Sequence, residues 1–144
     1  MPSVHFYTLN PERYPSAEDT LGVACRLTEK AVNHSHSVYI LTKSLAESIQ
    51  LDDLLWQFKS TSFIPHGIYN QDQKQSVPVL LGHSLPPDDF RGMVINLSNK
   101  PLDPIDQFER INELVGGDDM SLAQGRERYR AYRSHGVEIV TNKI

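Results

Sequence analysis

Short apolar runs alternate along the chain with longer segments in which apolar residues recur every three or four positions. The short runs are rich in β-branched and aromatic residues, which is typical of strands. Residues 37–42 are almost continuously apolar, as expected of a strand that is buried on both faces. The short runs predict strands over residues 4–9, 37–42, 77–81, 93–97 and 137–140.

The longer segments have the spacing of amphipathic helices, and residues that favour N-cap positions precede three of them. Ser16, Ser44 and either Asp118 or Asp119 are the predicted caps, and Gly136 ends the last helix. In residues 104–115 five apolar residues keep helical spacing until a glycine pair stops the pattern. The predicted helices cover residues 17–33, 45–55, 104–115 and 119–134.

The resulting order of elements is β-α-β-α-β-β-α-α-β, which predicts an α/β fold. We expect three layers: a largely parallel sheet with helices on both faces, in one domain over residues 1–144. The fold would be Rossmann-like without a nucleotide loop. The turn after the first strand, Thr8–Glu12, contains no glycine, and the chain has no Gly-Lys-Ser/Thr sequence.

Composition narrows the class of protein. The chain has 144 residues, a formal net charge of −4 and a single cysteine, Cys25. One cysteine excludes a disulfide framework within the chain and a multi-cysteine zinc site. The N-terminal sequence lacks the basic start and apolar stretch of a signal peptide, and no apolar run is long enough to span a membrane. We therefore expect a cytoplasmic protein without membrane contact.

Residue patterns that would carry catalysis are missing. The His34-Ser35-His36 sequence has no third metal ligand at a recognisable spacing, and Cys25 falls on an apolar helix stripe. No nucleophile-elbow motif is present. We expect no catalytic residue, no metal and no cofactor, although an α/β enzyme with an unrecognised site stays an alternative.

Positive charge is concentrated at the C-terminal end. From Ser121 to Ile144 four arginines and one lysine stand against two glutamates, a net charge of +3, so the other 120 residues carry −7. Arg126, Arg130 and Arg133 share one stripe of the predicted last helix, with Tyr129 at its border. Guanidinium groups beside an aromatic ring suit an acidic peptide that ends in an apolar or aromatic residue. A solvated helix face, with arginines complementing the helix dipole, is the alternative.

A second candidate surface is the aromatic segment Leu54–His66, which contains Trp56, the only tryptophan. Aromatic residues at a helix end serve equally often in the core and as anchors of protein–protein interfaces. The pattern alone leaves both possibilities open.

Together these segments resemble the chi subunit of the bacterial DNA polymerase III holoenzyme, an accessory protein of the clamp loader. The resemblance begins at the Phe6-Tyr7 strand and continues through LLWQFKSTSFIPH at Leu54–His66. It ends at RERYRAYRSHG, Arg126–Gly136. It covers essentially the whole chain and implies a non-catalytic adaptor of DNA replication.

The resemblance implies two protein partners. One is the acidic C-terminal tail of single-stranded DNA-binding protein, with Arg126 clamping its terminal carboxylate. Tyr129 and Val115 would line the pocket for the terminal Phe, and Arg130 and Arg133 would meet its aspartates.

The other partner is a psi subunit, which pairs one-to-one with chi and which Trp56 and Phe63 would contact. A monomer or one-to-one heterodimer that reaches DNA only indirectly is expected. Direct binding of single-stranded DNA by the arginine helix is the remaining alternative, and the −7 charge of residues 1–120 opposes it.

The sequence departs from the family pattern in the last helix. Leu122 stands where some relatives carry lysine, and Gly125 stands where alanine is more common. A glycine inside a helix costs roughly 0.5–1 kcal/mol relative to alanine. Gly125 therefore indicates either close packing or a looser site.

Overall fold

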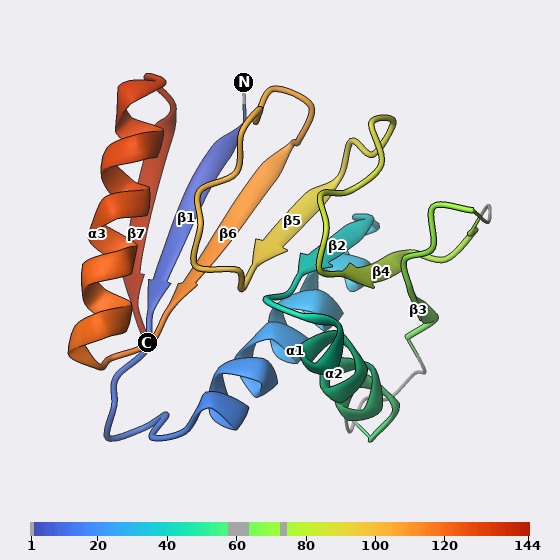
Figure 1. Ribbon diagram of the computed structural model, residues 1–144, viewed down its shortest axis with the longest axis horizontal. Helices are drawn as coiled ribbons and strands as arrows, with labels where there is room; N and C mark the ends of the chain where they lie inside the picture. The colour runs from blue at the N-terminus through green and yellow to red at the C-terminus, as the bar shows by residue number, and fades with distance from the viewer. Residues whose placement is uncertain (1, 58–63, 73–74) are drawn as a thin grey trace.

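The computed structural model describes residues 2–57, 64–72 and 75–144, and within these ranges the chain forms seven strands and three helices (Figure 1). The elements are β1 (Ser3–Thr8), α1 (Ala17–Asn33), β2 (Val38–Leu41), α2 (Leu45–Gln57), β3 (His66–Ile68), β4 (Val79–Gly82), β5 (Met93–Asn96), β6 (Arg110–Val115), α3 (Asp119–Ser134) and β7 (Glu138–Lys143).

All seven strands belong to one sheet in the order β3-β4-β2-β5-β6-β1-β7, and every neighbouring pair is parallel. Two apolar clusters cover its two faces. One contains buried side chains of α1 and α2, whereas the other contains Tyr132 of α3. Figure 1 shows α3 beside β7 and β1, and α1 and α2 near β2 and β4. The predicted three-layer α/β fold is confirmed.

The predicted caps begin the helices because their side chains satisfy free amide groups of the first turn. Ser16 and Asp19 form a reciprocal capping box at α1. Asp118 caps α3 by accepting from the amide of Ser121. At α2 the hydroxyl of Ser44 accepts from the amide of Glu47.

The helix predicted over residues 104–115 is wrong. Arg110–Val115 is strand β6, and residues 97–109 form an irregular connection without a helix. Ile105 and Phe108 are buried against the α3 face of the sheet, so their helical spacing reflects burial of a loop. This connection covers part of the sheet face, as a crossover helix does in other parallel sheets.

A cavity of about 240 Å³ lies at the carboxyl edge of the sheet, where doubly wound folds bind ligands. Among the described residues, its lining holds two carboxylates, Glu47 and Asp118, against one cation, Lys43, and this balance of charge disfavours a phosphate. The nearby Gly117 serves packing, because a Cβ there would lie 2.6 Å from the Cδ of Pro11.

Candidate protein-binding site

Arg126, Arg130 and Arg133 lie along the exposed side of α3. Within residues 2–57, 64–72 and 75–144, no carboxylate forms an ion pair with any of them. The spacing of three and four residues places the guanidinium groups on one side of the helix. The predicted basic stripe thus forms a row of exposed cations whose charge is not neutralised by neighbouring acids.

Tyr129 lies at the boundary between this row and the apolar core. Its side chain is partly buried and packs against the cluster on the α3 face. The ring centroid is 5.7 Å from that of Phe6 on β1, with the planes tilted by 51°. Such tilted contacts between aromatic rings are favourable, and they fix the Tyr129 ring beside the arginines.

Val115 ends β6 beneath α3 and is only 4% exposed. A Cβ built on Gly125 would lie 2.9 Å from Cγ1 and 3.1 Å from Cγ2 of Val115. The glycine therefore permits close approach of α3 to β6. Of the two explanations of Gly125, close packing is the correct one, and a looser site is not. Val115 lies directly below the helix turn that precedes Arg126 and Tyr129.

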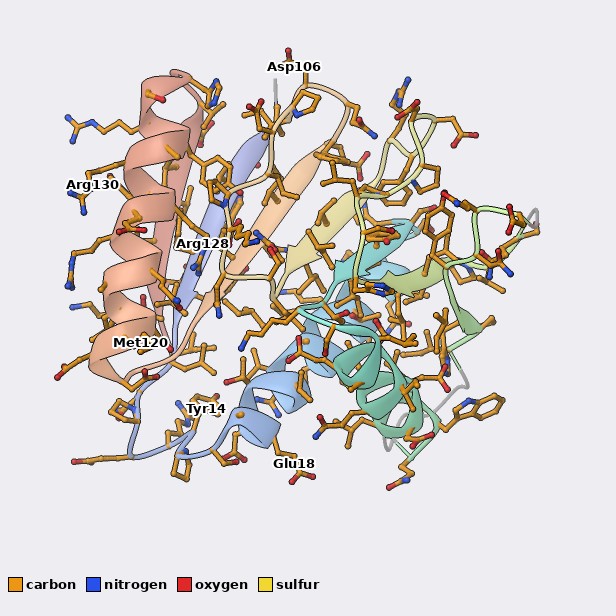
Figure 2. The ribbon with its side chains drawn as sticks, in the orientation of Figure 1. Tyr14, Glu18, Asp106, Met120, Arg128 and Arg130 are labelled. Carbon is orange, nitrogen blue, oxygen red and sulfur yellow. The ribbon has the colours of Figure 1, made fainter. Side chains whose placement is uncertain are left out.

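Arg128 points in the opposite direction from its neighbours on α3 and is 1% exposed. Figure 2 shows Arg128 directed toward the sheet, whereas Arg130 extends away from it. The Nε of Arg128 donates to Oε1 of Glu113 over 2.7 Å, and Nη2 donates to the carbonyl of Leu114 over 3.3 Å. The buried role of Arg128 was not predicted from the sequence, because its partner Glu113 lies in a segment that was predicted to be helical.

Glu113 is the centre of a buried polar network. The Oε2 of Glu113 accepts from the Tyr132 hydroxyl and from the Asn96 side-chain amide. The Tyr132 oxygen in turn accepts from the amide of Leu102 over 2.8 Å. Burial raises the pKa of Glu113, while the charge of Arg128 and the donated hydrogen bonds act against that rise. Burial and the Glu113 charge also raise the pKa of Tyr132. The network joins α3, β5, β6 and the loop between these strands.

Trp56 lies near the end of α2 and is 62% exposed. Its ring contacts that of His66 edge-on, with centroids 5.2 Å apart. The His66 Nε2 in turn lies 3.2 Å from a carboxylate oxygen of Asp52. Leu45 and Ile49 are also exposed on α2, at spacings that place them on the same side of the helix as Trp56. Phe63 lies outside the described residues.

Among the residues that the structure describes, no three His, Cys, Asp or Glu side chains form a group that could hold a metal ion. No helix in the same part of the chain is long and apolar enough to cross a membrane. Cys25 is buried in the core, and burial raises its pKa to about 11, as for an unreactive thiol.

The fold and the exposed surfaces define an α/β protein with two candidate protein-binding surfaces. The sequence profile of one family, described as "DNA polymerase III chi subunit, HolC", matches residues 1–140. The chain therefore belongs to the chi subunit family of DNA polymerase III, which makes it an accessory subunit of DNA replication.

Three curated relatives carry the name DNA polymerase III subunit chi. The protein of Pseudomonas aeruginosa is 35% identical over 144 residues, covering 100% of this chain and 98% of its own. The Haemophilus influenzae protein is 26% identical and covers 99% of this chain and 97% of its own. The Escherichia coli K12 protein is 24% identical over 120 residues, 83% of this chain and 82% of its own.

Proposed function

We propose that this chain is a non-catalytic adaptor that links the clamp loader, through a psi subunit, to the acidic C-terminal tail of single-stranded DNA-binding protein. The observation that carries the proposal is the row of unneutralised arginines on α3 beside the partly buried ring of Tyr129. An acidic peptide with a terminal aromatic residue complements both features. The adaptor would work in the cytoplasm as one domain, either alone or as a one-to-one heterodimer.

Arg126 and Tyr129 are proposed to hold the end of the tail. They are three residues apart on α3, so their side chains leave the same side of the helix. Arginine binds a carboxylate through two parallel hydrogen bonds, and the phenol ring offers an apolar face to the terminal Phe. Val115 supports this site from below, where it packs against Gly125.

Arg130 and Arg133 are proposed to meet the aspartates upstream of the terminal Phe. Both side chains are exposed, so each ion pair with an aspartate remains accessible to solvent. Exposed ion pairs contribute little individually, typically about 0.2–1 kcal/mol. They would therefore affect the association rate and the orientation of the bound tail more than its affinity.

Trp56 and Phe63 are proposed to contact the psi subunit. The support lies in the exposed apolar side of α2, where Leu45 and Ile49 accompany Trp56. An exposed tryptophan with apolar neighbours is a common anchor of protein interfaces. This surface belongs to α2 and the tail site to α3, so one chain could hold both partners at once.

Calorimetry tests the tail site. The full chain is titrated with a synthetic acidic peptide that ends in Pro-Phe, and Arg126→Ala is compared with Arg26→Ala as the control. Arg26 is an exposed arginine on α1, so its removal changes the net charge equally without touching α3. Binding at one site that only Arg126→Ala weakens supports the proposal. Equal weakening by both variants indicates general charge attraction and contradicts it.

Co-purification tests psi docking separately. The chain is expressed with a psi subunit, and Trp56→Ala is compared with Leu85→Ala, which removes another exposed apolar side chain in the loop after β4. Loss of the complex only with Trp56→Ala is expected. Retention of the complex by a folded Trp56→Ala protein that still binds the tail peptide would contradict this half of the proposal.

A further inference from the structure

We propose that the chain binds a phosphate monoester, as a dianion, in a third site that is separate from the two protein-binding surfaces on α2 and α3. The site is a cavity of about 210 Å³ between the C-terminal turn of α1 and strands β1, β5 and β6. Lys30, His34, His36 and Arg110 line it together with the polar groups of Tyr7 and Asn112. Four side chains that are cationic or can become so thus gather in a chain whose net charge is −4.

Arg110 is the main argument for an anionic ligand. Its side chain is only partly exposed, yet both hydrogen bonds from its guanidinium go to neutral groups. Nη2 donates to the hydroxyl of Tyr7 over 2.7 Å, and Nε donates to Oδ1 of Asn112 over 3.0 Å. In the described part of the chain, no carboxylate forms an ion pair with Arg110. Partial burial of an unneutralised charge is costly, and an anion in the cavity would offset that cost.

The two bonds to neutral partners also orient the guanidinium. With Nε and one N–H of Nη2 occupied, Nη1 and the second N–H of Nη2 remain for a ligand. Adjacent N–H groups of a fixed guanidinium match two oxygens of one phosphate. Arg110 is therefore held in place before any ligand arrives, which lowers the entropy cost of binding.

Lys30, His34 and His36 complete the positive lining from α1 and from the loop that follows it. The Nδ1 of His34 donates to the Lys30 carbonyl and that of His36 to the Glu109 carboxylate, so each ring can donate to a phosphate oxygen through Nε2 when the imidazole is protonated. Cations in the last turn of a helix complement its dipole, which accounts for Lys30 and His34 without a ligand. That explanation does not extend to Arg110, because Arg110 begins strand β6.

The acidic groups around the cavity do not cancel its charge. Glu109 is paired with His36, and it is half-exposed. Glu138 of β7 acts on the charge of His5, but neither residue lines the cavity. Within the described ranges, the lining holds the two cations Lys30 and Arg110 and no carboxylate, and Glu109 is the one acid paired with a lining side chain, so the excess of positive charge favours a dianion over a carboxylate monoanion. The volume is below the roughly 300–1,000 Å³ of typical small-molecule sites, which favours a compact phosphate over a dinucleotide.

NMR titration of the full-length chain tests the site, with inorganic phosphate as the probe and acetate at equal ionic strength as the comparison. The ring signals of His34 and His36 report directly on the cavity. We expect saturable shifts with phosphate and at least tenfold weaker binding of acetate. Shifts that do not saturate, or that are equal for both anions, would overturn the proposal.

Arg110→Gln is the diagnostic variant, and Arg26→Gln on the exposed side of α1 is its charge-matched control. We expect Arg110→Gln to weaken phosphate binding at least tenfold and Arg26→Gln to change it less than twofold. Lys30→Gln provides a second test that disturbs no bond between strands, with an expected weakening of at least threefold. Unchanged binding by Arg110→Gln, or by a folded Lys30→Gln protein, would contradict the proposal.

The type of phosphate is tested with a nucleoside monophosphate and a short single-stranded oligothymidylate without terminal phosphates. A monoester provides a dianion, whereas each diester provides one charge. We expect the monophosphate to bind at least as tightly as inorganic phosphate and the oligonucleotide to bind more weakly. Tighter binding of the oligonucleotide at this cavity would contradict the assignment to a monoester.

Discussion

The buried side chains of Arg128 and Glu113 fix how α3 rests on the sheet. The Nε of Arg128 lies 2.7 Å from Oε1 of Glu113, and the two side chains are 1% and 0% exposed. Because Arg128 faces inward, helix periodicity turns Arg126 and Arg130 toward solvent. A pair that contacts no proposed partner thus determines which arginines can bind one.

Removal of one member of this pair is expected to be costly. Glu113→Gln leaves the Arg128 charge buried without a countercharge, which typically lowers the free energy of unfolding by about 3–5 kcal/mol. Urea unfolding followed by circular dichroism measures the change. Glu127→Gln is the matched control, since Glu127 is exposed on the same helix and its replacement should change stability by less than about 0.5 kcal/mol. Equal stability of the two variants would contradict the role of the pair.

The close approach of Gly125 to Val115 leads to a second prediction about α3. Gly125→Ala adds a methyl group 2.9 Å from Val115 Cγ1, so overpacking opposes the helix propensity that alanine gains. We expect a net loss of about 1–2 kcal/mol in the free energy of unfolding. In a Val115→Ala background, which removes both contacting methyl groups, the same substitution should be neutral or stabilising. Additive effects of the two substitutions would show that this contact does not limit the helix position.

Most of the fold follows from local patterns, and the main error has a physical cause. Residues within a short stretch of sequence are enough to predict the helix caps at Ser16 and Asp118. The same is true of strands β2 and β5, which are short apolar runs. In β6 the polar residues Asn112 and Glu113 interrupt the apolar pattern, although both are buried. Their burial depends on partners elsewhere in the chain, which no local pattern encodes.

The exposed half of the candidate site was predictable, and the buried half was not. The spacing of Arg126, Arg130 and Arg133 placed them on one stripe, and the structure leaves all three exposed. Arg128 lies on the opposite side of α3, and its buried partner Glu113 belongs to a strand that was predicted to be part of a helix. Similarly, the tight contact of Gly125 with Val115 can be predicted only when the positions of both α3 and β6 are known.

The thiol of Cys25 is expected to be inert in the folded protein. It is 1% exposed, and burial raises its pKa to about 11, so thiolate is scarce at pH 8. A colorimetric disulfide reagent at that pH should react within the mixing time only after the chain is unfolded in denaturant. Rapid stoichiometric reaction of the native protein would contradict the placement of Cys25 in the core.

The arginines upstream of the tail terminus should make a modest contribution that depends on salt. We expect Arg130→Gln and Arg133→Gln each to weaken binding of the acidic peptide by about 0.2–1 kcal/mol, because the contacts stay solvated. The loss should shrink as added salt shortens the screening length from ~10 Å at 0.1 M to ~3 Å at 1 M. Anisotropy of a labelled peptide across a salt series measures both effects. A loss that is independent of salt would argue against these ion pairs.

The most direct test of the tail-capture account is the coupling between Arg126 and the terminal carboxylate of the peptide. Calorimetry of wild type and Arg126→Ala is performed with the Pro-Phe peptide as a free acid and as its C-terminal amide. If Arg126 holds that carboxylate, the free acid should lose about 1.5–3 kcal/mol on Arg126→Ala, and the amide should lose much less. Equal losses for the two peptides would show that Arg126 does not contact the carboxylate, and the proposed orientation of the tail on α3 would be wrong.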